Sequence, residues 1–318
     1  MGTFIARRLI LALIVLIIVT LLVFLVIRLL PGDPILVYMT RQDSQKLTEE
    51  QIQEARHKFG LDKPMVLQYV DWIDGIFRGD FGISLNYLEP VNQLLAERIP
   101  ITLNLGILAF VIGSVVGVSA GVIAALRRGK AIDTLMASLS YIGIAIPIFW
   151  LGVLLIYFFG LELRLLPMFG YTSPFTDLGE NIRQLILPVF CLAVTPVASL
   201  ARQTRSSMLE VIRQDYIRTA WSKGLRERSV VMRHALKNGL IPIVTLMGIS
   251  LSYILGGSVL IETVFNIPGM GRLSVDALLG KDYAVIQAVV LIVAAMIVLA
   301  NLLVDLAYGW LDPRIRYG

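Results

Sequence analysis

Charged residues are scarce in this sequence, and cysteine and histidine are almost absent. Only 16% of the 318 residues are charged and 57% are hydrophobic, whereas a soluble domain has about 25% charged residues. The single cysteine, Cys191, excludes a disulfide within the chain, and its apolar surroundings favour the role of a small buried hydrophobe. This composition is typical of a polytopic membrane protein.

Six apolar segments are long enough to cross a bilayer, which needs about 20 helical residues. The first is too long for a signal peptide and ends at Pro31 without a cleavage site, so we expect an uncleaved helix. Pro188 and Pro196 interrupt the fourth, although neighbouring helices can satisfy the backbone groups that proline frees. The sequence therefore predicts an all-α fold with six transmembrane helices. They are Leu9–Leu30, Ile101–Leu126, Leu135–Gly160, Leu185–Ala201, Leu240–Ile261 and Ala284–Tyr308.

No charged residue or histidine lies near the middle of any of these spans; Arg28, Glu262 and Asp305 lie near span ends. A charge at a span centre costs at least about 2.5–3.5 kcal/mol, so one found there usually marks ion or proton coupling. Its absence argues against a proton- or sodium-driven carrier and leaves a channel open. The sequence also shows no nucleophile–base pair and no metal-ligand cluster, so we expect no catalytic site, metal or cofactor in this chain.

The distribution of charge predicts the orientation of the spans. The loop from residue 202 to residue 237 has nine Lys or Arg residues against three acidic ones, whereas residues 31–100 have seven against eleven. Since loops rich in Lys and Arg stay in the cytoplasm, both termini and the 202–239 loop are expected there. Residues 31–100 are expected outside the membrane.

The external segment has helix signals of its own. Thr48 with Gln51 fits a capping box that opens a helix ending at Gly60, and Pro64 can begin a second helix that ends at Gly79. We expect a packed helical insert, with a docking surface for an external partner as the alternative. The chain then divides into a first helix (1–30), this insert (31–100) and a core with the remaining spans (101–318).

The second span has a stripe of glycines at every fourth position. Glycines at this spacing let two helix backbones approach closely. The partner helix could belong to this chain or to a second subunit, and we favour packing within the chain. The residues are Gly113, Gly117 and Gly121.

The segment from Asp215 to Pro242 predicts a basic helix–turn–helix between two spans. Tyr216, Ala220 and Trp221 have helical spacing, Gly224 suits the end of that helix, and a second helical pattern follows. Such a segment could dock a cytoplasmic partner, lie on anionic lipid or merely set the topology. DNA binding suits a loop tethered at both ends poorly.

These residues resemble the "EAA" loop of ABC-importer permeases, in the variant of the dipeptide/oligopeptide/nickel family. Arg218-Thr-Ala220 stands where other importers have Glu-Ala-Ala, and Arg226 stands where a capping Thr or Ser is usual. The resemblance covers essentially the whole chain. Its motifs are Leu30-Pro-Gly-Asp-Pro34, Gly79-Asp-Phe-Gly-Ile-Ser84, Tyr216-Ile-Arg-Thr-Ala220, Lys223-Gly224-Leu225, His234-Ala-Leu-x-Asn238 and Pro268-Gly-Met-Gly-Arg272.

The resemblance implies a non-catalytic permease subunit in a bacterial or archaeal plasma (inner) membrane, forming half of a translocation pathway for peptides. It implies a heterodimer with a similar permease, two cytoplasmic ATPase subunits that bind ATP and Mg, an external substrate-binding protein and no nucleic acid. A nickel chelate, glutathione or an oligosaccharide is the alternative cargo. A channel, a secondary carrier or a membrane enzyme is a remote alternative.

The resemblance also implies roles for two sets of residues. The 202–239 loop would be a coupling loop on the ATPase, and a hairpin after the fifth span would face the binding protein. The expected ATPase-docking residues are Tyr216, Ala220, Trp221, Lys223, Gly224, Leu225, Arg226, Val230, His234 and Asn238. The expected residues of the hairpin are Pro268, Gly269, Gly271 and Arg272.

Overall fold

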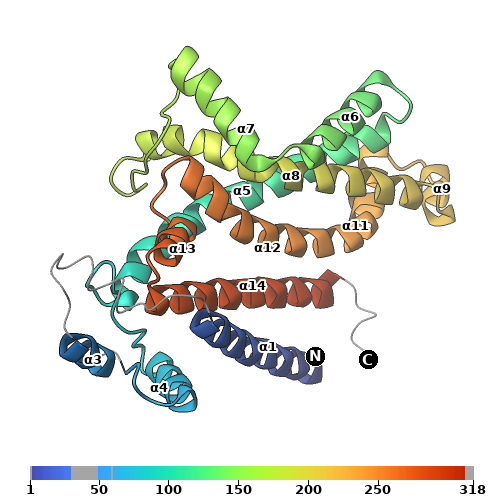
Figure 1. Ribbon diagram of the computed structural model, residues 1–318. Coiled ribbons are helices and arrows are strands. Elements are labelled where there is room, and N and C mark those ends of the chain that lie inside the picture. The colour runs from blue at the N-terminus through green and yellow to red at the C-terminus, as the bar shows by residue number, and fades with distance from the viewer. Residues whose placement is uncertain (1, 30–48, 59, 312–318) are drawn as a thin grey trace. The chain divides into compact units, whose positions relative to one another are not determined.

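The structure is a computed structural model that describes residues 2–29, 49–58 and 60–311 (Figure 1). The described residues are mainly helical, and among them β-structure is limited to an isolated antiparallel bridge between Ile83 and Pro90. The helices are α1 (Gly2–Leu29), α3 (Glu49–Lys58), α4 (Met65–Phe77), α5 (Val91–Leu126), α6 (Ala131–Ala145), α7 (Ile148–Leu155), η1 (Ile156–Glu162), α8 (Leu178–Ile212), α9 (Asp215–Ser222), α10 (Glu227–Ser229), η2 (Val230–Ala235), α11 (Leu236–Gly239), α12 (Ile241–Val264), α13 (Met270–Leu279) and α14 (Tyr283–Leu311).

Five of these helices are long and apolar enough to cross a membrane: α1, α5, α8, α12 and α14. A sixth span is formed if α6 and the α7–η1 helix are counted together, although they are bent by 102° at their junction. The all-α class is therefore confirmed, whereas the predicted count of six spans holds only if this bent pair is one span. The orientation of the termini and the external place of residues 31–100 stay predictions.

The third span was predicted as one helix, Leu135–Gly160, and this prediction is wrong. Ile146, between α6 and α7, has extended backbone angles (φ −74°, ψ 126°) and directly precedes Pro147. Proline has no N–H to donate, and its ring disfavours the helical conformation of the residue before it. In contrast, Pro188 and Pro196 lie inside the continuous 35-residue helix α8, so the expected interruption of the fourth span is absent.

Backbone contacts divide the chain into two compact units. The first takes in Thr102–Ile267 together with the described residues at both chain ends, and α8 is its centre, with α6, α7 and α12 packed against it. In Figure 1, α6 and α7 diverge from their shared turn beside α8. Since α8 is largely covered by protein, its neighbours can satisfy the carbonyl groups that its two prolines leave free.

The three glycines of α5 lie against α8. A Cβ atom added at Gly121 would lie 2.5 Å from the carbonyl oxygen of Ala201, and one at Gly117 would lie 2.9 Å from Leu200 Cβ. At Gly113 the nearest atom, 3.2 Å away, is Cβ of Pro196. The contact is therefore within this chain, and the helices approach more closely toward Gly121, where no side chain larger than hydrogen fits.

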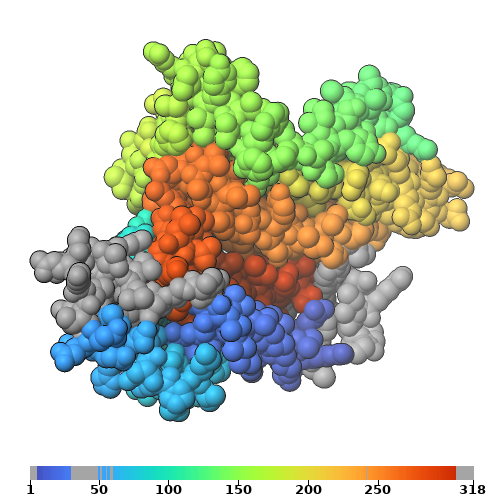
Figure 2. All heavy atoms as spheres, viewed as in Figure 1, coloured from blue at the N-terminus to red at the C-terminus, as the bar shows by residue number. Residues whose placement is uncertain are grey.

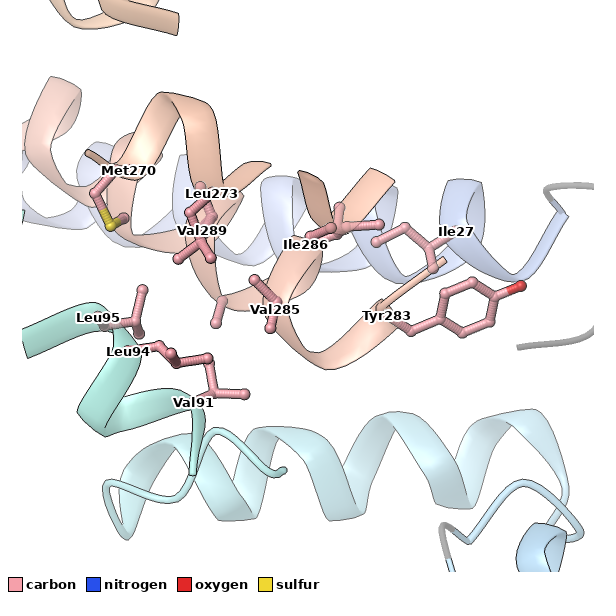
Figure 3. Packing of buried hydrophobic residues seen from close by; sticks show 12 residues of the cluster. Ile27, Val91, Leu94, Leu95, Met270, Leu273, Tyr283, Val285, Ile286 and Val289 are labelled. Carbon is pink, nitrogen blue, oxygen red and sulfur yellow. The ribbon is translucent and has the colours of Figure 1, made fainter. Parts of the chain in front are cut away.

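The second unit joins residues 6–101 to residues 268–296. Its core brings the first turns of α5 onto α13 and the start of α14 (Figure 3). Val91, Leu94 and Leu95 point toward Leu273 and Val289 in that view. The loop before α5 is fixed to α14 because the buried Asp282 accepts hydrogen bonds from Ser84 Oγ (2.5 Å) and Asn86 N (3.0 Å).

The predicted helices of the insert are present. The first, α3, ends before Gly60 (φ +64°), and α4 begins directly after Pro64 and is followed by Gly79 (φ +76°). The capping box itself lies outside what the structure describes, because Thr48 and the side chain of Gln51 are not among the described groups.

Candidate functional site

The helix–turn–helix between α8 and α12 is the candidate functional site. Helix α9 ends in a Schellman motif, in which Gly224 N donates to the carbonyl of Trp221 (2.9 Å) and Leu225 N to that of Ala220 (3.4 Å). Gly224 is left-handed, with φ +76°. The turn thus depends on a residue without a side chain, as the sequence predicts.

The second half of the segment runs through α10, η2 and α11 to α12. Arg226 precedes α10 in an extended conformation and makes no side-chain capping bond, as expected where Arg replaces Thr or Ser. Residues 202–212 of the predicted loop belong to α8 instead, because that helix continues to Ile212. The segment that protrudes from the spans is therefore shorter, from residue 213 to residue 239.

A small apolar core holds the two halves together and onto the ends of α5 and α8. It contains Ile217 and Ala220 of α9, Val230 of η2, Met208 of α8 and Ala125 of α5. Ala220 and Val230 were expected at the docking surface, but both are buried. Their side chains can position the turn, and they cannot touch a partner.

Polar contacts fix the same segment. Asn238 Nδ2 donates to the Tyr216 hydroxyl (3.1 Å) and to the carbonyl of His234 (2.9 Å), which ties α11 to α9. Ser207 Oγ of α8 donates to the carbonyl of Gly239 (2.9 Å). The segment is therefore bonded to itself and to α8, and a displacement of its surface would be transmitted to the spans on either side.

The outer face of this segment combines exposed apolar side chains with basic ones, and α9 lies uncovered in the view of Figure 2. Tyr216, Trp221 and Leu225 are 46%, 40% and 42% exposed. Met232 is 54% exposed and was not among the expected docking residues. Its place next to Arg233 was its only signal in the sequence. The exposed basic residues are Arg213, Arg218, Lys223, Arg226, Arg228, Arg233 and Lys237.

An ion pair braces the turn between α5 and α6 against α8. Arg205 donates from Nε (2.5 Å) and Nη2 (2.9 Å) to the two carboxylate oxygens of Asp133, which also accepts from Gly129 N (2.9 Å). Asp133 is buried, and a two-pronged Arg–carboxylate contact fixes orientation as well as distance. The sequence did not identify this pair because its members are far apart along the chain.

The residues expected to face a binding protein do not form a hairpin. Gly271 and Arg272 lie in the first turn of α13, while Pro268 and Gly269 precede it. Arg98 donates to the carbonyl of Pro268 (3.1 Å) beside a cavity of about 200 Å³. The hairpin prediction is wrong because the residues after Gly269 form helix α13.

Solved structures share the fold of this helical chain, in which the segment lies between two candidate spans. The chain superposes on a MetNI methionine ABC transporter structure with a TM-score of 0.57, at 20% identity, covering 69% of this chain and 97% of that one. An amino acid ABC transporter gives a TM-score of 0.51 at 18% identity, covering 68% and 94%. The fold is that of an ABC importer permease.

The chain belongs to the family described as binding-protein-dependent transport system inner membrane component. The family model matches residues 117–317, and the model of the family's N-terminal region matches residues 1–106. Three relatives match over 100% of this chain and at least 99% of their own. They are a Sinorhizobium fredii protein named "Probable peptide ABC transporter permease protein" (45% identical), a di/tripeptide permease of Pseudomonas aeruginosa (40%) and a dipeptide permease of Escherichia coli (39%).

These relatives are named as permease proteins. A permease subunit of an ABC transporter is non-catalytic, and ATP hydrolysis belongs to a separate subunit. This chain is accordingly a multi-pass, non-catalytic permease subunit of an ABC transporter.

Proposed function

We propose that this chain forms half of the translocation pathway of an ATP-driven importer for di- or oligopeptides. The cargo proposal rests on the names of its relatives, which match over the full length of the chain at 39–45% identity. The other half is a similar permease in a heterodimer, an external binding protein delivers the peptide, and two cytoplasmic ATPases supply the energy. The bilayer is a bacterial or archaeal inner membrane, with both termini in the cytoplasm.

The observation that carries this proposal is the rigid attachment of the 213–239 segment. It joins α8 to α12 without a long linker and is packed onto Met208 and Ala125. A partner that holds its exposed face can therefore move two spans together. Because no charge lies near the middle of the spans, an external source of work is the simplest way to drive transport.

The surface of the segment indicates the chemistry of the ATPase cleft. The segment has seven exposed basic side chains and only two exposed acidic ones, Asp215 and Glu227, so an acidic rim is complementary. The exposed Trp221 and Leu225 would fill an apolar pocket at the centre, since buried aromatic anchors contribute most of the energy in protein interfaces.

Cysteine cross-linking tests the docking. In a Cys191→Ser background, Leu225→Cys is expected to cross-link to the ATPase subunit when an acidic rim residue of that subunit is replaced by cysteine. Phe175→Cys is the matched control, because Phe175 is 99% exposed and is expected on the opposite side of the membrane. Equal cross-linking of both positions, or none at Leu225, would contradict the proposal.

Uptake into proteoliposomes tests the cargo. With the cognate binding protein and ATPases present, a labelled dipeptide is expected to accumulate in an ATP-dependent way and to be displaced by excess unlabelled peptide. Accumulation of a nickel chelate, glutathione or an oligosaccharide instead of peptide would overturn the choice of cargo while leaving the docking proposal intact.

A further inference from the structure

One face of helix α12 is open along a candidate span that runs from Pro242 to Val264. From Thr245 onward its exposed residues recur at every third or fourth position, as one face of a helix requires. Part of this helix is also uncovered in the view of Figure 2. The exposed face therefore meets lipid, water or another protein. Its residues are Thr245, Ile249, Tyr253, Gly256, Leu260 and Thr263.

Hydroxyl groups distinguish this face from the surface of α1. Between Leu9 and Leu29 the exposed residues of α1 are all leucine, isoleucine or valine, as expected of a helix that meets acyl chains. Half of the residues on the exposed face of α12 carry a hydroxyl. Thr263 Oγ1 donates to the carbonyl of Val259 in the same helix (2.7 Å), so a threonine here could also lie against lipid. The distinction therefore depends on Tyr253.

Tyr253 lies at the middle of the span, and its side chain is 41% exposed. At 1.5 Å per residue it is about 16 Å from either end of the span, which is farther than a tyrosine side chain extends. Its hydroxyl therefore cannot reach the headgroup level, where tyrosine is usually found, and a phenol is too long to donate to its own helix. In hydrocarbon this hydroxyl would lose its hydrogen bonds at a cost of about 1–3 kcal/mol. Tyr253 thus requires a polar neighbour at the depth of the bilayer.

Open space adjoins Tyr253 on the same face. A Cβ atom added at Gly256 would meet no atom within 4 Å, whereas one added at the next residue, Gly257, would lie 3.4 Å from Ile148. Thr245 and Thr263 lie about 12 Å and 15 Å from Tyr253 along the helix axis, in opposite directions. The exposed face therefore has hydroxyl groups at three depths of the span and free space at its centre, as the lining of a polar passage requires.

We propose that the exposed face of α12 lines the translocation pathway, and that the Tyr253 hydroxyl forms a hydrogen bond with the backbone of the passing peptide. This inference rests on the proposed function, which supplies both a pathway and a cargo with peptide groups. A phenol can donate and accept, and the peptide backbone is common to every such cargo. The contact is therefore independent of the sequence of the peptide. Packing of the second permease against this face is the contrary outcome of the tests.

Labelling of introduced cysteines by a charged, water-soluble thiosulfonate tests the lining. Tyr253→Cys and Gly256→Cys are compared with Ile18→Cys in a Cys191→Ser background, in the assembled transporter in proteoliposomes with reagent on both sides. Ile18 is the matched control, because it is 50% exposed at the middle of the α1 span. The α12 cysteines are expected to react at least about tenfold faster, because the thiolate is the reactive form and a thiol in hydrocarbon stays protonated. Labelling as slow as that of Ile18→Cys would overturn the inference.

A larger residue at Gly256 supplies a second test. Since an added Cβ meets no atom within 4 Å and leucine is a better helix former than glycine, Gly256→Leu is expected to keep or raise the thermal midpoint of the purified chain. In the pathway its side chain would obstruct the cargo. ATP-dependent dipeptide uptake is therefore expected to fall about tenfold, since a forced steric contact costs about 1–3 kcal/mol, while the second permease still co-purifies. Gly256→Ala is the smaller control and is expected to keep most of the uptake. Wild-type uptake by Gly256→Leu, or loss of the second permease from its complex, would overturn the inference.

The two tests separate this inference from the choice of cargo. Labelling reports contact with water and needs no peptide. Slow labelling of the α12 cysteines in a transporter with normal dipeptide uptake would reject the lining and leave the proposed function intact. Fast labelling in a transporter that accumulates a nickel chelate instead of a dipeptide would support the lining, and would remove the peptide contact of Tyr253 together with the proposed cargo.

Discussion

Replacing Gly224 by valine tests whether the turn after α9 couples the spans to a partner. Gly224 has φ +76°, and a Cβ atom added there would have no neighbour within 4 Å. The whole effect of the substitution therefore comes from the backbone conformation, which costs a branched residue about 1–3 kcal/mol. At about 2 kcal/mol, the turn would be depopulated roughly 30-fold.

Gly129 provides a matched control. It also has φ +76° and no neighbour within 4 Å of an added Cβ, but it lies in the turn between α5 and α6. Gly129→Val should therefore carry similar strain outside the candidate docking segment. Gly224→Asn provides the rescue, because asparagine adopts the left-handed conformation far more readily than valine.

The assay is ATP hydrolysis stimulated by peptide-loaded binding protein in proteoliposomes. In Gly224→Val the stimulated rate of ATP hydrolysis is expected to fall at least about tenfold, because the turn is destabilised by about 2 kcal/mol. Gly224→Asn and Gly129→Val are expected to stay near the wild-type rate. Thermal midpoints of the purified variants show whether the two valine substitutions are equally destabilising. Full stimulation in Gly224→Val, or the same loss in Gly129→Val, would refute the reasoning.

Two further predictions concern packing and stability. Gly121→Ala is expected to destabilise the chain by about 1–3 kcal/mol, because its Cβ would lie 2.5 Å from the backbone of α8. Gly113→Ala should be tolerated better, because its Cβ would lie 3.2 Å from its nearest neighbour. Thermal midpoints in detergent compare the two variants, and a lower midpoint for Gly113→Ala would contradict the packing described. Ser84→Ala removes a hydrogen-bond donor to the buried Asp282 and is expected to destabilise the chain by about 1–3 kcal/mol. The thermal midpoint in detergent measures this loss, and an unchanged midpoint would contradict it.

The sequence predicted best those features that depend on local chemistry. Five of the spans could be predicted from the sequence because a bilayer requires about 20 successive apolar residues. The ends of α3 and α9 could be predicted because Gly60 and Gly224 adopt positive φ angles that other residues avoid. Since these constraints act within a few residues, no knowledge of the tertiary structure is needed to find them.

Prolines were harder to interpret. Pro188 and Pro196 were expected to interrupt the fourth span, yet α8 continues through both, whereas the third span bends by 102° at Pro147. All three positions are surrounded by apolar residues, so hydropathy does not distinguish them. Whether a proline breaks a membrane helix depends on which neighbours satisfy its freed backbone groups, and this is a property of the packed bundle.

The amino-acid sequence alone determined the class of this protein, five of its apolar spans and the place of its basic helix–turn–helix, because apolar length, basic charge and glycine turns are local quantities. Only the tertiary structure decided that Ala220 and Val230 are buried beneath that segment, and that Tyr253 is exposed at the middle of α12. Burial and the meeting of distant side chains depend on how helices pack, and no local pattern along the chain specifies that.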